Sequence, residues 1–203
     1  MKGKLVAFTG LDCAGKTSAI RSTKLSLEHR NISTMVFENH APYSAYWNVY
    51  KKIAREFAVK GEQVPYELDR FMQAFELCLN CEETLPQLMR EFGVVLSDRY
   101  VLDKIIYGRL RGKQNIAERA LQTINFRPDL TIFLDVSVET AIKRIKSKGG
   151  PEDWKEHPEM LYRAHQSYNE TLKGLDIPIV TICAEKPLDQ VVDQCVEEIL
   201  KLV

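Results

Sequence analysis

Short apolar runs alternate along this chain with longer segments in which apolar and polar residues mix. Runs rich in branched and aromatic residues are typical of buried strands, whereas the mixed segments between them fit helices. The predicted strands are Leu5–Thr9, Thr34–Glu38, Val94–Ser97, Thr131–Asp135 and Ile179–Ile182. This alternation predicts an α/β fold, a doubly wound, parallel, five-stranded sheet flanked by helices. No repeat or linker interrupts the pattern, so we expect residues 1–203 to form a single domain.

Two parts of the chain exceed what a simple crossover between strands needs. Helical patterns over Tyr43–Val59 and Tyr66–Arg90 both lie between the second and third strands. Farther along, the segment about 147–158 contains Gly-Gly-Pro and is bordered by helical patterns that carry Arg144 and Arg163. A glycine-rich segment between helices is typical of a short lid that closes over a site, and we expect one here.

Candidate chemistry begins where the first strand ends. The G-x-x-x-x-G-K-T phosphate loop is matched by Gly10-Leu11-Asp12-Cys13-Ala14-Gly15-Lys16-Thr17. Glycines permit a tight turn of N–H groups around a triphosphate, and the next helix directs its positive end at the anion. Lys16 supplies charge to the β- and γ-phosphates, and the Thr17 hydroxyl can ligate Mg²⁺. The expected contacts of a nucleoside triphosphate are Gly10, Asp12, Cys13, Ala14, Gly15, Lys16, Thr17 and Ser18.

Composition narrows the class of protein. Lys plus Arg and Asp plus Glu number 28 each, so no overall field attracts nucleic acid or an anionic membrane, and we expect neither as a partner. The N-terminus enters a strand without an apolar leader, which predicts the cytosol. The odd total of 5 cysteines favours reduced thiols, and we interpret Cys78 and Cys81, a C-x-x-C in a helical run, as packing residues.

The end of the third predicted strand carries a second candidate group, Asp98 followed by Arg99. Asp98 can hold a metal-bound water or accept a proton from a hydroxyl, and Arg99 can grip a phosphate in a fork. A GTPase switch is disfavoured because the chain lacks an N-K-x-D element to read guanine. A small phosphoryl-transfer enzyme, which needs cations and a lid that excludes water, fits better.

Four runs carry a family resemblance, namely Phe8–Thr17, Ser97–Tyr100, Pro128–Val136 and Arg163–Tyr168. With them the chain resembles the thymidylate kinase family of nucleoside monophosphate kinases over nearly its whole length. The resemblance implies a P-loop kinase fold with a short lid, ATP and Mg²⁺ as cofactors, and a pyrimidine deoxynucleotide such as dTMP as the acceptor. It also implies a homodimer, which is usual in the family.

The resemblance further implies roles for individual residues. Asp12 would face the acceptor sugar, Arg99 the acceptor phosphate, and Thr17 with Asp98 the metal. Cys13 stands where some members of the family carry an arginine in the phosphate loop, so the lid side must supply that charge. The residues that it assigns to catalysis are Lys16, Asp98, Arg99, Arg144 and Arg163.

Departures from the family pattern fall on the acceptor side. The arginine that commonly follows the second strand is missing, and Glu38 opens that segment instead. Where the family reads thymine with a phenylalanine and a following arginine, this chain offers Phe71, Gln73 and Phe75, and Tyr107 alone matches farther on. We therefore expect altered base recognition by a substrate site that contains Asp12, Glu38, Phe71, Gln73, Phe75, Arg99 and Tyr107.

Two alternatives stay open at this point. The same departures resemble, more faintly, the deoxynucleoside kinases, in which Glu38 would be the general base for a 5′-hydroxyl, and Trp47 and Gln73 would contact the base. The other alternative is a sensor that binds ATP without transferring its phosphate.

Overall fold

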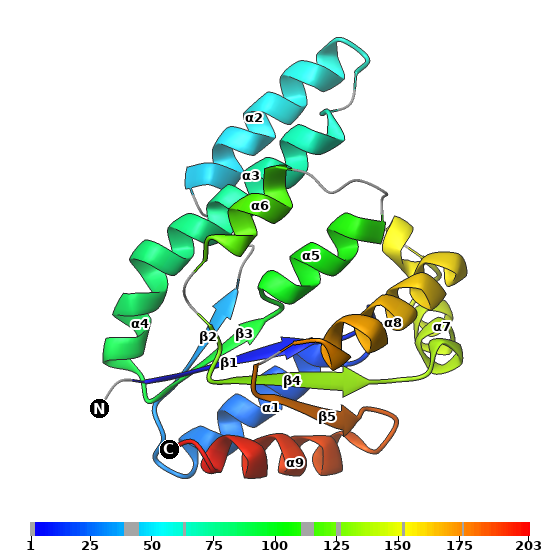
Figure 1. The fold of residues 1–203 in the computed structure, drawn as a ribbon. Helices are drawn as coiled ribbons and strands as arrows, with labels where there is room; N and C mark the ends of the chain where they lie inside the picture. Colours follow the sequence, from blue (N-terminus) through cyan, green and yellow to red (C-terminus); the bar gives the residue numbers. More distant parts are fainter. Residues whose placement is uncertain are drawn as a thin grey trace.

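The computed structural model describes residues 3–38, 45–62, 64–110, 116–124, 127–151, 153–175 and 177–203. Its centre is a five-stranded sheet in the order β2-β3-β1-β4-β5 (Figure 1). The strands are β1 (Lys4–Thr9), β2 (Thr34–Glu38), β3 (Val94–Asp98), β4 (Leu130–Asp135) and β5 (Ile179–Cys183). All four pairings are parallel, so every carboxyl end lies at the same edge of the sheet. The doubly wound α/β fold is confirmed, and the predicted strand positions agree to within a residue.

Helices cover both faces of this sheet. Helix α1 (Lys16–Glu28) and helix α9 (Leu188–Leu200) lie side by side on one face (Figure 1). The remaining helices cover the opposite face or extend beyond it. They are α2 (Ala45–Val59), α3 (Tyr66–Leu79), α4 (Leu85–Glu91), α5 (Val101–Leu110), α6 (Ile116–Gln122), α7 (Val138–Ser147) and α8 (Pro158–Lys173). Helix α2 and the first part of α3 project from the body as a helical arm (Figure 1).

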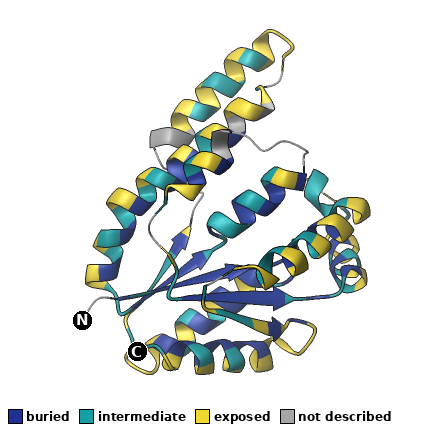
Figure 2. Ribbon diagram, viewed as in Figure 1, coloured by how far each residue is buried: buried dark blue, intermediate teal, exposed yellow. Residues whose placement is uncertain are grey.

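The core follows from the two-residue period of the strands. In β1, Val6 and Phe8 belong to a buried cluster that includes Ile20 of α1, while Leu5 and Ala7 belong to a second cluster with helices α3 and α4. The central strands β1, β3 and β4 are buried along almost their whole length (Figure 2). A sheet buried on both faces requires nearly continuous apolar strands, which explains why these runs stand out in the sequence.

One predicted helix is wrong in detail. The pattern over Tyr66–Arg90 forms three consecutive pieces, because a π-helical turn, η1 (Asn80–Thr84), separates α3 from α4. Pro86 explains the break, since proline has no N–H and its ring clashes with the carbonyl four residues earlier in a regular α-helix. The wider π turn accepts Pro86 at the start of α4 without ending the helical path. The predicted start of the preceding helix at Tyr43 lies outside the described residues.

The expected lid region joins α7 to α8. Its described part contains a short 3₁₀ turn, η2 (Trp154–Glu156), preceded by Gly149 and Gly150, which both have positive φ. Among the described residues, no helix is both long and apolar enough to cross a membrane.

Candidate active site

The phosphate loop, residues 10–17, turns sharply between β1 and α1. Gly10 has φ 140°, and a Cβ atom placed on it would lie 2.6 Å from the carbonyl oxygen of Leu134. Gly15 has φ 93° and caps α1, whose first helical hydrogen bond runs from Ala19 N to Gly15 O at 2.9 Å. Both positions need glycine, one for space and conformation and the other for conformation alone. The result is a helix N-terminus whose free N–H groups face an open cleft.

The side chain of Lys16 lies beneath this turn. Its ammonium group is buried and donates hydrogen bonds to Leu11 O at 2.6 Å and Gly10 O at 3.1 Å. Burial, together with the charge of Arg99, lowers the pKa of Lys16 to about 8 despite the nearby carboxylates. A buried cation next to the N-terminus of a helix is a strong attraction for the phosphates of a nucleotide.

Thr17 and Asp98 form the candidate metal site at the carboxyl ends of β1 and β3. The Thr17 hydroxyl donates to Asp98 Oδ2 at 2.9 Å, so both oxygens face the same point of the cleft. Mg²⁺ prefers hard oxygen ligands and usually takes only one or two from a protein, with water and phosphate oxygens completing its octahedron. The hydroxyl and carboxylate therefore fit this ion.

Arg99 lies at the centre of the neighbouring acidic network. Its backbone has φ 65°, an uncommon conformation for a residue with a side chain, and its N–H donates to Phe8 O at 3.0 Å. The guanidinium pairs with Asp12 and, at 2.7 Å, with Asp103. These carboxylates raise the pKa of Arg99 above its usual value against the effect of burial. Tyr168 supports the network by donating to Asp103 Oδ1 at 2.7 Å.

Two adjoining clefts surround the phosphate loop. The first, about 450 Å³, holds nine of the predicted residues and also Lys148. Its lining consists of Asp12, Cys13, Gly15, Lys16, Thr17, Ser18, Glu38, Asp98, Arg99 and Lys148. The second, about 320 Å³, extends from the loop toward α7 and the turn after β5, and is lined in part by Ala14, Arg144 and Leu188. Cys13, Gly15, Ser18 and Lys148 line both clefts, so a long ligand can span them.

The two lid-side arginines are placed differently from each other. Arg144 lines the second cleft and donates to Cys13 O at 3.2 Å and to Ala184 O at 2.8 Å, so it ties the phosphate loop to the turn after β5. Arg163 donates to Leu110 O at 2.9 Å, and its half-exposed side chain lines neither cleft. The structure thus brings Arg144, but not Arg163, to the phosphate loop.

The predicted base-binding residues do not gather at one place. Phe71 and Phe75 are 39% and 49% exposed and stack on each other with centroids 6.2 Å apart, on a face of α3 that lines neither cleft. Their contact with substrate stays a prediction. Gln73 instead accepts hydrogen bonds from Arg70 at 3.2 Å and Lys104 at 3.5 Å. The side chain of Trp47, which the deoxynucleoside kinase alternative places against the base, lies outside the described part of the structure.

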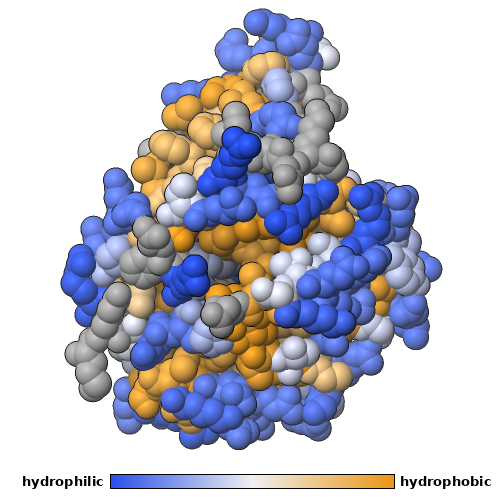
Figure 3. Space-filling view, in the orientation of Figure 1, coloured by the Kyte–Doolittle hydropathy of each residue, from blue (hydrophilic) through white to orange (hydrophobic). Residues whose placement is uncertain are grey.

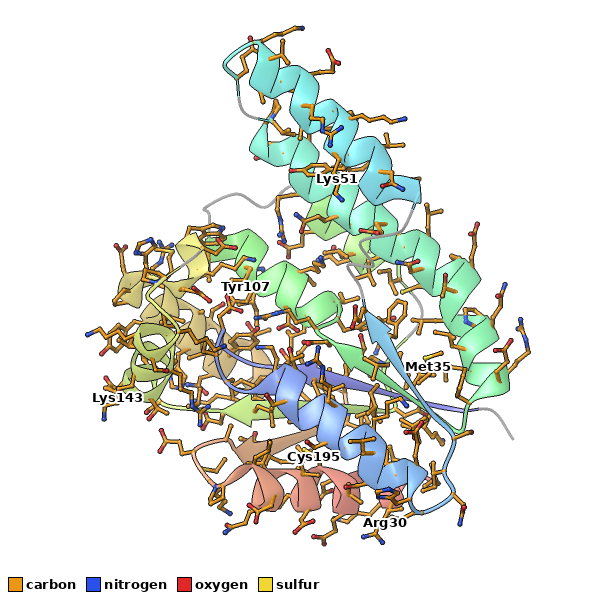
Figure 4. All side chains as sticks on the ribbon, turned by 180° about the vertical axis from the view of Figure 1, so that it is seen from behind. Arg30, Met35, Lys51, Tyr107, Lys143 and Cys195 are labelled. Carbon is orange, nitrogen blue, oxygen red and sulfur yellow. The ribbon has the colours of Figure 1, made fainter. Side chains whose placement is uncertain are left out.

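Tyr107 lies beneath Arg99, with the guanidinium carbon 5.2 Å from its ring centroid. Burial raises the pKa of this tyrosine, so its hydroxyl stays protonated at neutral pH. Figure 4 shows Tyr107 on α5 beside the segment that follows α7. The residue therefore supports the acidic network and faces the lid.

Several residues near the clefts were not predicted from the sequence. Lys148 and Lys155 belong to the predicted lid, where a basic side chain near a phosphate loop is itself a signal. Asp103 received no role from the sequence, although its pairing with Arg99 follows the i, i+4 spacing of a helix start. The contact of Tyr168 with Asp103 joins residues 65 positions apart and has no local signal.

Comparison with known proteins agrees with this geometry. The family model described as Thymidylate kinase matches residues 8–195. A thymidylate kinase of Latilactobacillus sakei is 29% identical, covering 98% of this chain and 95% of the relative, and one of Lactobacillus acidophilus is 27% identical over 98% and 94%. A probable thymidylate kinase of Pyrobaculum aerophilum is 27% identical over 98% and 96%. The family match extends from the end of β1 into α9, and on that evidence this chain belongs to the thymidylate kinase family.

Proposed function

We propose that this protein transfers the γ-phosphoryl group of ATP to the phosphate of dTMP and releases ADP and dTDP. The observation that carries the proposal is the position of Arg99 and Asp98 beside the phosphate loop, within one cleft, in a chain of the thymidylate kinase family. The named relatives are thymidylate kinases, which supports dTMP as the acceptor.

On the donor side, ATP would occupy both clefts. Its phosphates would meet the N–H groups of the phosphate loop and the ammonium of Lys16, while the adenosine would extend toward Arg144 and Leu188. Thr17 and Asp98 would hold Mg²⁺, which when bound neutralises charge on the phosphate oxygens. Arg144 also orients the loop, because its hydrogen bond to Cys13 O fixes the backbone that faces the phosphates.

On the acceptor side, the role of the protein is positioning and charge stabilisation, since the phosphate oxygen of the acceptor is already a nucleophile. Arg99 would grip the acceptor phosphate, and Asp12, paired with Arg99, would face the sugar. Lys16 and Arg99 both donate to Gly10 O, so both cations would lie near the transferring group, where negative charge spreads in the transition state. We expect this reaction to take place in the cytosol.

The first test measures ADP formation with dTMP, dUMP, dCMP and thymidine as acceptors, using the wild-type protein and Lys16→Ala. Wild-type turnover with dTMP and a loss of at least roughly 10²-fold in Lys16→Ala are expected, because Lys16 contacts the charge that develops in transfer. Lys143→Ala, which removes an exposed lysine on α7 (Figure 4), is the matched control and should keep full activity. Wild-type-like turnover in Lys16→Ala would sink the assignment.

A second candidate function, phosphorylation of a free deoxynucleoside, has one observation in its favour. Glu38 lines the main cleft and pairs in register with Asp98 across β2 and β3, where a general base for a 5′-hydroxyl could lie. Turnover with thymidine but not with dTMP would select this alternative. Glu38→Gln would then abolish activity, whereas it should alter dTMP phosphorylation only mildly.

We also propose that the protein is a homodimer. Leu68, Phe71, Phe75 and Leu79 follow one another at helical spacing on α3, and each is more than a third exposed. Apolar surface gathers along the helical arm (Figure 3). A contiguous apolar stripe of this kind usually marks a surface that another protein covers, and a second copy would pair the stripe with itself.

A further inference from the structure

The lid places a lysine close to the acidic network. Trp154 of the 3₁₀ turn packs edge-on against Tyr107, with ring centroids 6.4 Å apart and planes at 86°. The next residue, Lys155, has its Nζ 5.6 Å from the centroid of the same Tyr107 ring. Because the Arg99 guanidinium carbon is 5.2 Å from that centroid, a cation from the lid and a cation from the end of β3 both lie against the Tyr107 ring.

The charge balance explains what this lysine can do. Arg99 faces two carboxylates, Asp12 and Asp103, so these three groups together carry a net negative charge. A phosphate monoester is close to a dianion at neutral pH, so placing one beside these carboxylates requires more positive charge than Arg99 alone supplies. Lys155 is close enough to affect the charge of Asp12. Burial would raise the pKa of Asp12, but the positive charges of Arg99, Lys16 and Lys155 together lower it below its usual value.

Lys155 is available for a ligand. Its ion pair with Asp153, at 3.4 Å, joins two side chains that are 32% and 46% exposed, and such exposed pairs contribute little to stability. Lys148, the other lid lysine, lines both clefts and has its Nζ 3.6 Å from Cys13 Sγ of the phosphate loop. Lys148 therefore lies beside the phosphate loop, whereas Lys155 lies against Tyr107.

We propose that Lys155 binds the 5′-phosphate of the acceptor nucleotide, as the second cation beside Arg99. The inference rests on the proposed function, in that the acceptor carries a phosphate. Because η2 belongs to the lid, the acceptor phosphate would hold the lid down through Lys155, and a nucleoside without a phosphate would not. Lys155 thus distinguishes a nucleoside monophosphate from its nucleoside.

The experiment compares dissociation constants for dTMP and thymidine by calorimetry in wild type, Lys155→Ala, Lys155→Arg and Lys148→Ala. Losing one charge-assisted hydrogen bond should weaken dTMP binding by roughly 10- to 100-fold in Lys155→Ala. The affinity of Lys155→Ala for thymidine should equal that of wild type, and Lys155→Arg should recover most of the affinity for dTMP. Lys148→Ala should weaken the binding of ATP more than the binding of dTMP.

Two results would overturn the inference. Equal loss of dTMP and thymidine affinity in Lys155→Ala would mean that the lysine only supports the lid, and unchanged dTMP affinity would mean that it makes no contact. A failure of the proposed function looks different. If wild type prefers another base, the same comparison between that nucleotide and its nucleoside still tests Lys155, because the predicted contact is to the phosphate.

Discussion

Lys16 keeps an ammonium group in a buried position, and this has a consequence for pH dependence. With a pKa of about 8, the group is charged at neutral pH in the free protein and loses its proton as the pH rises through 8. A bound triphosphate favours the charged form, so the pKa of Lys16 must rise when ATP binds. Above pH 8, ATP binding should therefore take up a proton, and affinity should fall by up to about tenfold per pH unit.

Calorimetry in two buffers of different ionisation enthalpy measures this proton uptake. At pH 9 the wild-type protein should take up close to one proton per ATP. Lys16→Arg is the matched control, because its guanidinium keeps its charge throughout this range and should show no such uptake. Equal uptake in both proteins would contradict the assignment to Lys16.

Asp103 holds the acidic network together from a nearly fully buried position, accepting from both Arg99 and Tyr168. Asp103→Asn keeps the shape but removes the charge that pairs with Arg99, and we expect a loss of about 2–3 kcal/mol in the free energy of unfolding. Tyr168→Phe removes one neutral donor and leaves the ion pair, so its loss should be about 1 kcal/mol.

Urea unfolding measures both losses. Glu28→Gln is the control, since it breaks an exposed i, i+4 pair with Lys24 on α1 and should cost less than about 0.5 kcal/mol. If Asp103→Asn lowered the free energy of unfolding no more than Glu28→Gln does, the buried ion pair of Asp103 and Arg99 would not contribute to the stability of the fold.

At the scale of elements, Trp154 is one of the residues through which the lid contacts the body of the molecule. This side chain is half-buried and packs on Tyr107 and the main apolar cluster, between the positive-φ glycines on one side and α8 on the other. An aromatic pair of this geometry contributes about 1 kcal/mol beyond its buried area, enough to shift a lid equilibrium about fivefold.

Trp154→Ala should therefore lower kcat/KM for transfer by at least about fivefold while leaving the melting temperature almost unchanged. Hydrogen exchange should become faster in the segment about 147–158 and stay the same in the sheet. Trp154→Phe should keep most of the activity. A large drop in melting temperature would instead mean that Trp154 belongs to the global core.

At the scale of the whole molecule, the apolar stripe on α3 bears on assembly. If a second copy covers it, Phe75→Glu should turn a dimer into a monomer, because a charge would enter the centre of the interface. Sedimentation equilibrium at micromolar concentration measures the mass. Leu25→Glu, at an exposed leucine of α1, should leave the dimer intact. A wild-type protein that is monomeric under these conditions would contradict the proposed dimer.

The fold class could be predicted from the sequence alone, and so could the residues proposed for the donor half of the site. The strands were readable because a parallel sheet buried on both faces needs apolar runs, and the phosphate loop was readable because its chemistry lies within residues 10–17. Asp98 and Arg99 were found for a related reason, since parallel strands place their carboxyl ends at one edge. Each of these features can be recognised from residues that are close together in the sequence.

Tertiary structure decided the acceptor half. Phe71 and Phe75 stack on each other on a face of α3 that lines neither of the two clefts, and the sequence holds no local signal for which face of a helix meets a cleft. The network around Arg99 joins residues from the phosphate loop, α5 and α8, and the lid adds Lys155 over Tyr107. Contacts between segments so far apart depend on how the elements pack, and this packing sets which charges meet the acceptor.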